Sequence, residues 1–158
     1  MKQLRKNLGP EGKIFCLSMQ RNGTSSVGDF IEKFGLKRIG SPVSNKKRWP
    51  LAWFNGDFET IFNDETFISA EILEDDPWWF PEFYKVLYHR FPGSKFILLE
   101  RDPDHWFKSM IHHSNGFSIG ITEVHSKIYR RENEYSWLKT AIPDFGIKRN
   151  QEMVLYDK

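Results

Sequence analysis

Two groups of polar side chains, far apart in the chain, have the residue types that bind anions. The first runs from Ser18 to Ser26, with the sequence SMQRNGTSS, directly after the apolar run IFCL of residues 14–17. The second contains Arg101, shortly after the apolar run FILL of residues 96–99, and Ser109 further along. A guanidinium pairs with phosphate in a forked geometry, and hydroxyl groups add donors. Two such sites indicate a nucleotide with two separate phosphate groups.

The first group has the layout of an anion site at the start of a helix. Residues 13–17 predict a short buried strand, and Gly35 is placed to end the helix that follows. Four apolar residues share one face of that helix: Val27, Phe30, Ile31 and Phe34. A loop between strand and helix gathers free backbone N–H groups at the positive end of the helix dipole. Gly23 lets the backbone approach an anion, and Arg21 adds a fixed charge.

The loop lacks the lysine of a Walker A phosphate-binding loop. That pattern is G-x-x-x-x-G-K-[ST], whereas here Ser18 takes the place of the first Gly and Thr24 that of the Lys. The absent Lys argues against hydrolysis of ATP or GTP. Two plainer interpretations stay open: a Ser/Thr-rich helix start without a ligand, and a surface Arg101 paired with Asp104 beside a solvated Ser109.

The elements that would position these residues alternate between strands and helices. Residues 67–72 and 95–99 predict strands, and the second is the clearest in the chain. Asp76-Pro77 and Asp102-Pro103 each resemble a helix start, with Asp as N-cap and Pro in the first turn. One or two short helices are expected within residues 41–66, and a further helix near Val124 and Ile128. This alternation predicts an α/β fold, a three-layer domain over residues 1–158 with a mainly parallel central sheet flanked by helices.

Composition excludes several classes of protein. The formal net charge of +2 is too small to predict binding to nucleic acid, and no stretch approaches the ~20 apolar residues of a membrane span. The basic residues 1–13 have no apolar region of a secretory signal, so we expect a cytoplasmic protein. The single cysteine, Cys16, cannot form an internal disulfide and is expected to be a buried thiol. The histidines show no metal-ligand pattern, so no metal site is expected.

The two groups together resemble the PAPS-dependent sulfotransferases, in particular a bacterial-type, P-loop-like branch. PAPS is 3'-phosphoadenosine 5'-phosphosulfate. Members carry a loop like GLPRTGTTS after the first strand, where this chain has SMQRNGTSS, and the resemblance spans about residues 13–115. The second matching run is long and comprises Asp76-Pro77, residues 83–87, residues 91–98, Arg101-Asp102, Trp106 and Ser109.

The resemblance implies a role for each matching residue. The first loop would hold the 5'-phosphosulfate of PAPS through Arg21, Asn22, Gly23, Thr24, Ser25 and Ser26. Arg101 and Ser109 would hold the 3'-phosphate. Gln20 replaces the usual Pro, and Asn22 replaces a hydroxyl residue; neither removes a charge, so donor binding is expected to survive. The family continues past residues 156–158 with a further helix, strand and helix, so we expect this chain to lack those elements.

The chemistry implied is transfer of a sulfuryl group from PAPS to a hydroxyl or amine, which leaves PAP, adenosine 3',5'-bisphosphate. Arg21 would stabilise charge on the departing 5'-phosphate, and a base would take the acceptor proton. Asp76 is the first candidate base, with Glu74 and His112 as alternatives, although Asp76 could be a plain N-cap. The acceptor is expected to be a small molecule or a glycan. Two other functions stay open: a kinase, and a nucleotide-binding remnant of a sulfotransferase without activity. The sequence does not fix the oligomeric state.

Overall fold

The computed structural model describes residues 12–113, 123–130, 132–133, 136 and 140. The chain divides into two compact units, Met1–Trp106 and Phe107–Lys158, and each is described by itself. Among the described residues, no helix is both long and apolar enough to cross a membrane.

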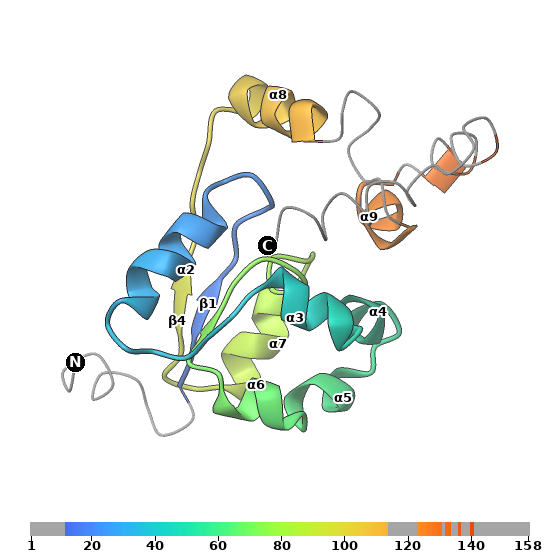
Figure 1. Cartoon of the computed structure of the whole chain (residues 1–158). Coiled ribbons are helices and arrows are strands. Elements are labelled where there is room, and N and C mark those ends of the chain that lie inside the picture. Colours follow the sequence, from blue (N-terminus) through green and yellow to red (C-terminus); the bar gives the residue numbers. More distant parts are fainter. Residues whose placement is uncertain (1–11, 114–122, 131, 134–135, 137–139, 141–158) are drawn as a thin grey trace. The chain divides into compact units, whose positions relative to one another are not determined.

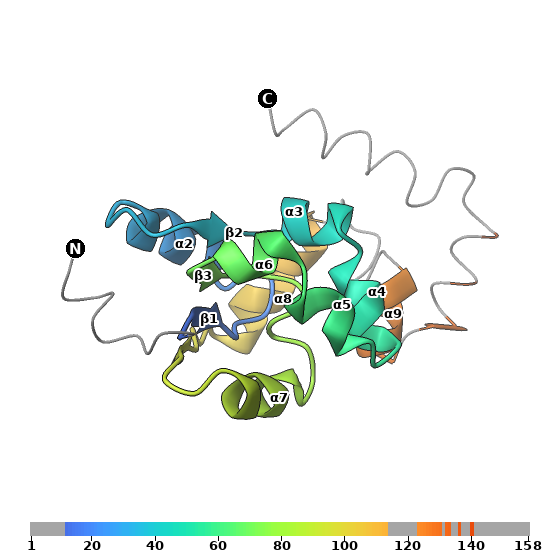
Figure 2. The same cartoon turned by 90° about the horizontal axis from the view of Figure 1, so that it is seen from below.

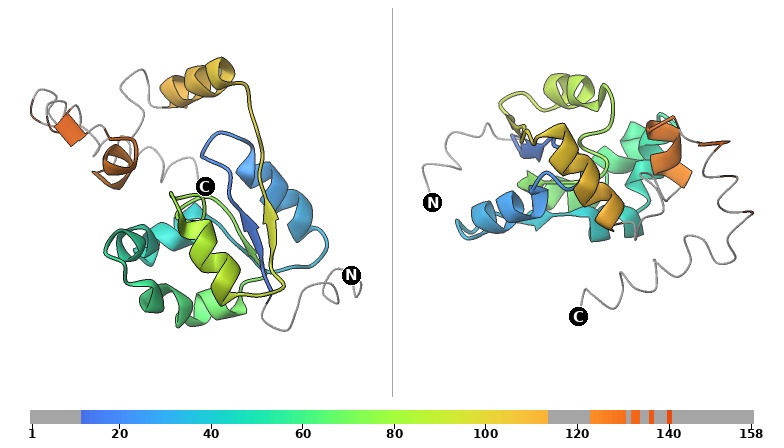
Figure 3. Two further views of the ribbon diagram at one scale, coloured as in Figure 1. Left: turned by 180° about the vertical axis from the view of Figure 1, so that it is seen from behind. Right: turned by 90° about the horizontal axis from the view of Figure 1, so that it is seen from above.

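Four short parallel strands form the sheet of the first unit. They are β1 (Ile14–Cys16), β2 (Arg38–Ile39), β3 (Ile72–Leu73) and β4 (Lys95–Ile97). Their order across the sheet is β2-β3-β1-β4, so β1 lies between β3 and β4. Figure 3 shows β1 (blue) beside β4 (yellow). The predicted strand at residues 95–99 is therefore β4. The α/β class with a parallel sheet is confirmed.

Helices cover both faces of this sheet. Helix α2 (Thr24–Glu32) lies on one face and α7 (Phe83–Arg90) on the other (Figure 2). Side chains alternate along β1 accordingly. Ile14 packs into a small cluster with Leu36 and Ile72, while Phe15 joins the larger cluster on the opposite face. The expected three layers, helix–sheet–helix, are confirmed.

Short helices between β2 and β3 (Figure 1) supply many residues of the larger cluster. They are α3 (Ser41–Lys46), α4 (Trp49–Phe54), α5 (Phe58–Phe62) and α6 (Glu65–Ser69). Trp49 and Phe67 from these helices contact each other and Trp78, which follows β3 and whose ring centroid lies 5.6 Å from that of Phe15 in β1. Two more helices follow β4: α8 (Pro103–His113) and α9 (Glu123–Ile128). The helices expected near Asp102 and near Val124 are confirmed.

Two local predictions are wrong, and a third is only partly correct. Residues 67–72 are not a strand, because α6 continues to Ser69 and β3 begins at Ile72. Asp76-Pro77 does not start a helix, since α7 begins only at Phe83. The apolar face expected for α2 is only partly the buried one: Val27 and Ile31 are half-buried, and Ile31 packs against the small cluster, whereas Phe30 is 60% exposed and the fully buried residues are Thr24 and Gly28. Gly35 does follow the helix in a left-handed conformation, with φ 76°.

Candidate functional site

The loop between β1 and α2 leaves the sheet at its centre. Because β1 has a parallel neighbour on each side, its carboxyl end lies where ligands collect in open α/β sheets. The start of this loop is fastened to the end of β4: Leu17 N–H donates to Ile97 O at 2.8 Å. Ser18, fully buried, accepts the N–H of Leu99 through its Oγ at 2.5 Å. Sequence reasoning assigned Ser18 no role, although it occupies the first position of the loop motif.

The start of α2 is open to an anion. Its N-cap is Gly23, in a left-handed conformation with φ 90°, and no side chain caps the first turn. The first turn carries no acidic residue. Thr24 is buried, whereas Ser25 and Ser26 are exposed. The first N–H groups of the helix, the dipole and these hydroxyls are the groups that the sequence predicts would bind an anion, and that role stays a prediction.

The structure brings Arg101 to the same loop. Its NH1 donates to the main-chain oxygen of Arg21 at 2.7 Å, and both arginine side chains are exposed. Arg21 has a left-handed backbone with φ 67°. Arg101, from a segment far along the chain, is therefore fastened to the backbone of the loop that carries Arg21. Ser109 and His112 lie on α8 within the second unit, so their parts in the site stay predictions.

Asn22 is tied to the neighbouring strand end. Its side-chain nitrogen donates to Leu99 O at 3.4 Å, and its backbone N–H to Met19 O at 3.3 Å. Its Oδ1 is buried and has no hydrogen-bond partner among the described residues. A buried amide oxygen of this kind can still accept a hydrogen bond.

Asp76 lies buried beside the loop, with 2% of its surface exposed. Its Oδ1 accepts the indole N–H of Trp79 at 2.7 Å. The side-chain nitrogen of Gln20 lies 3.3 Å from Oδ1 and 3.2 Å from Oδ2. The backbone oxygen of Gln20 accepts the indole N–H of Trp106 at 2.9 Å. The structure therefore joins the candidate base to the loop, through Gln20, a residue without an assigned role in the sequence.

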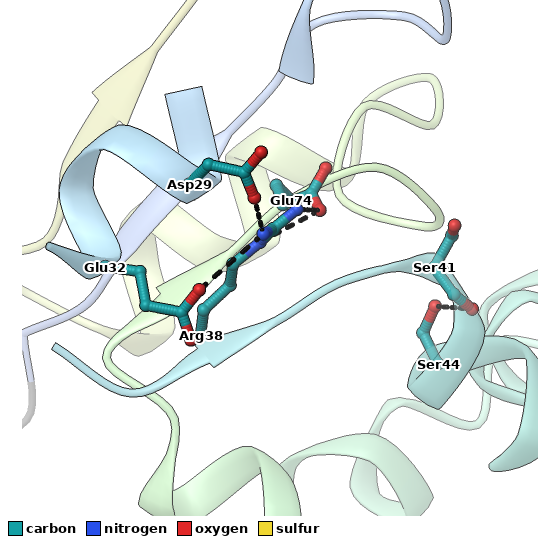
Figure 4. Close-up of polar contacts among 6 residues, drawn as sticks. All are labelled: Asp29, Glu32, Arg38, Ser41, Ser44 and Glu74. Carbon is teal, nitrogen blue, oxygen red and sulfur yellow. Dashed lines mark hydrogen bonds and ion pairs between the residues drawn. The ribbon is translucent and has the colours of Figure 1, made fainter. Parts of the chain in front are cut away.

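Glu74, the alternative base, is held by an arginine (Figure 4). Its Oε1 accepts from NH2 of Arg38 at 2.7 Å, and 3% of its side chain is exposed. Arg38 also pairs with Asp29 and Glu32 of α2. Burial alone would lower the pKa of the Arg38 guanidinium, but the hydrogen bond and charge of Glu74, followed by those of Asp29, raise it above the ordinary value. Glu74 is thus one partner of a charge cluster beneath α2.

The thiol of Cys16 is buried, as the sequence predicts. Burial raises its pKa, and this effect outweighs the hydrogen bonds with Ser18 that lower it. A neutral buried thiol is a poor nucleophile. Elsewhere in the described part of the chain, no three His, Cys, Asp or Glu side chains are placed to hold a metal ion.

Comparison with known proteins places this arrangement in a family. A search of curated proteins finds no match for the chain. The profile of one family, described as a sulfotransferase domain, matches residues 13–145, which include β1, the loop, Asp76 and Arg101. Since that match covers most of the sequence, the chain belongs to the sulfotransferase domain family.

Proposed function

We propose that this protein binds PAPS at the loop from Ser18 to Ser26 and transfers its sulfuryl group to a hydroxyl or amine acceptor. One observation carries the proposal: the uncapped start of α2, with no acidic residue in its first turn, has Arg101 fastened to the loop before it. A ligand with two phosphate groups suits this arrangement, and it occurs in a chain of the sulfotransferase domain family.

The residues present fit the charges of such a donor. The N–H groups at the start of α2, the hydroxyls of Thr24, Ser25 and Ser26, and Arg21 would hold the 5'-phosphosulfate, with Asn22 and Gly23 shaping the loop. Arg101 and Ser109 would hold the 3'-phosphate. The exposed guanidinium groups of Arg21 and Arg101 can reach a ligand without prior unfolding of the loop.

PAPS, when bound, supplies the sulfuryl group. In the transfer, the bond between sulfur and the 5'-phosphate oxygen breaks while a bond from sulfur to the acceptor oxygen or nitrogen forms. Arg21 would neutralise the charge that develops on the 5'-phosphate, and Asp76 would take the acceptor proton. The acceptor we propose is a small molecule or a glycan with a hydroxyl or amine.

Calorimetric titration tests the donor site. Adenosine 3',5'-bisphosphate should bind without magnesium and much more tightly than AMP, ADP or ATP, because only it offers a 3'-phosphate. Arg101→Ala should weaken the bisphosphate by roughly 30- to 150-fold, equivalent to about 2–3 kcal/mol for a charge-assisted pair, and should barely change AMP binding. Equal affinities for AMP and the bisphosphate would contradict the proposal.

Single-turnover transfer from labelled PAPS to a panel of acceptors tests the chemistry. Arg21→Ala should weaken donor binding and slow transfer. Asp76→Asn should leave bisphosphate affinity intact and lower the transfer rate by roughly 10²–10⁴. Near-normal transfer by the Asn variant would remove Asp76 from the mechanism and favour Glu74 or His112. A chain that binds the bisphosphate but transfers to no acceptor would be a nucleotide-binding protein without activity.

A further inference from the structure

Gln20 lies half-buried at a junction of three segments. Its side-chain nitrogen donates to the carboxylate of Asp76, which comes from the segment after β3. Its main-chain oxygen accepts from the indole of Trp106, at the start of α8. The next residue, Arg21, is held in turn by Arg101. Gln20 is therefore fixed through its side chain and its backbone, and it lies next to a residue of the proposed donor site.

We infer that Gln20 is a positioning residue, which fixes the Asp76 carboxylate relative to the donor-binding loop. The inference rests on the proposed function, in which Asp76 takes the proton of the acceptor. A proton acceptor works only when its oxygen lies within hydrogen-bond reach of the group that loses the proton. The position of the Asp76 oxygens against the donor is therefore a requirement of the reaction.

The geometry of the two donors supports this role. Trp79 donates its indole N–H to Oδ1 of the Asp76 carboxylate. The amide nitrogen of Gln20 reaches both oxygens, at 3.3 Å from Oδ1 and 3.2 Å from Oδ2, so it holds the carboxylate at a second point, from the loop. Because a buried carboxylate is costly without donors, this contact persists.

Gln20 also links the Asp76 carboxylate to the proposed donor site. Gln20 belongs to the loop itself, and the indole of Trp106 holds its main-chain oxygen in place. A shift of the loop would therefore shift the carboxylate. Asp76 and the loop are separated by a long stretch of sequence and meet through this side chain. A proline at position 20 could not make the contact, since its ring has no N–H to donate.

Gln20→Met tests the inference, since methionine has a similar length and no N–H. We expect the affinity for adenosine 3',5'-bisphosphate to change by less than about threefold and the single-turnover transfer rate to fall on the order of 10- to 100-fold, as for a misplaced catalytic group. Asn63→Ala is the matched control: it removes an amide–carboxylate contact with Glu59 on the surface and should change neither quantity. A Gln20→Met variant whose affinity falls as much as its rate would overturn the inference, because Gln20 would then support the loop alone.

A double variant separates positioning from independent effects. In the Asp76→Asn background, Gln20→Met should slow transfer no further, because the group that it positions is already lost. Rate losses that multiply would show that Gln20 acts elsewhere, and the inference would fall.

The indole N–H signals in a ¹⁵N–¹H spectrum give a readout that does not depend on activity. Gln20→Met should shift the signal of Trp79, which shares the Asp76 carboxylate with Gln20, and Asn63→Ala should leave it in place. An unchanged Trp79 signal would overturn the inference whatever the activity. Absence of bisphosphate binding by the unmutated chain would instead overturn the proposed function, so the two failures are distinguishable.

Discussion

The two faces of the sheet are held in different ways. On the face opposite α2, aromatic rings fill the core: Phe67 lies within ring-contact distance of Trp49, Phe62, Trp78 and Phe91. On the face that carries α2, the apolar cluster is small, and the charged side chain of Arg38 lies between helix and strand. The helix whose start would hold the donor is therefore docked by a charge cluster, whereas the opposite face is docked by many ring contacts.

On the α2 face, two glycines leave room for the charged side chains. A Cβ atom at Gly28 would lie 2.4 Å from Nε of Arg38, and one at Gly40 would lie 2.5 Å from Oε1 of Glu74. Glycine at both positions admits the guanidinium–carboxylate pair beneath α2. The stability of the α2 face thus depends on a few charged groups. A substitution of one of them should act by leaving its partner without a counter-charge. On the aromatic face, each ring has several neighbours, and the loss of one leaves a cavity.

The largest expected effect is on the aromatic face. Phe67→Ala should lower the free energy of unfolding by about 3–5 kcal/mol, because it removes a side chain with only 1% of its surface exposed and leaves a cavity. Urea unfolding followed by tryptophan fluorescence measures it. A loss below about 1 kcal/mol would mean that the neighbouring rings collapse into the space and that the face is packed loosely.

Arg38→Met should come next, at about 3 kcal/mol, because it leaves the carboxylate of Glu74 buried without its cation. The double variant Arg38→Met/Glu74→Leu should recover most of that loss, since two apolar groups can replace a buried ion pair. Glu59→Gln, which breaks the exposed pair with Arg90, is the control and should change stability little. If Arg38→Met costs no more than this control, the charge cluster does not dock α2. These three variants and the unmutated protein are compared by urea unfolding at neutral pH.

Gly28→Ala should have a smaller effect, a loss of about 1–2 kcal/mol from the clash with the Arg38 side chain. In the Arg38→Ala background the clash disappears, and the same change should stabilise the protein, because alanine favours a helix over glycine by about 1 kcal/mol. Thermal unfolding of the unmutated protein, the two single variants and the double variant measures this reversal. Equal losses in both backgrounds would show that Gly28 is needed for a reason other than Arg38.

The smallest effect concerns Asp64, which caps α6 at the edge of the aromatic face. Desolvation would raise the pKa of its carboxyl, but hydrogen bonds from Lys47 and Thr66 outweigh it and hold the pKa below the usual value for aspartate. Its charge therefore stabilises the fold above the pKa of the unfolded chain, and the contribution is lost as the pH falls through the lower folded value. Asp64→Asn, which keeps a good cap, should cost up to about 1 kcal/mol at pH 7. Unfolding measured over an acid series should show the two proteins converging; a constant difference would contradict the assignment.

The two Asp-Pro pairs show which helix starts the sequence can predict. The same two residues predict a helix start at 76 and at 102, and only the second is correct. Asp102 accepts the N–H of His105 at 2.9 Å. Both partners lie within one helical turn, so a local sequence pattern is enough to predict this contact. The carboxylate of Asp76 instead accepts hydrogen bonds from the side chains of Trp79 and Gln20. The contact with Gln20 crosses much of the chain, so local propensity cannot predict it.

In the loop after β1 and in α2, too, local features could be predicted and long-range contacts could not. The order of strand, glycine-containing loop and helix could be predicted because its signals are consecutive, and Gly23 occupies the left-handed position that favours glycine. The apolar period of α2 predicts only part of the buried face, since Ile31 packs against the small cluster but Phe30 is exposed and Gly28 is buried. That choice depends on Arg38, whose partners Asp29 and Glu74 lie on either side of it in the sequence. The meeting of Arg101 with Arg21 likewise requires the sheet order.

Lys13, just before β1, gives the protein a built-in chemical probe. Its ammonium donates to three carbonyl oxygens, of Phe67, Ile68 and Ala70, at 2.9, 3.0 and 2.7 Å, and only 7% of the residue is exposed. An ammonium has three N–H bonds, and here each meets an oxygen at the end of α6. An amine-acylating reagent needs an accessible nitrogen lone pair, so Lys13 should resist labelling while surface lysines such as Lys85 react. Acylation of Lys13 would then report, by mass spectrometry, the moment at which α6 separates from the first strand.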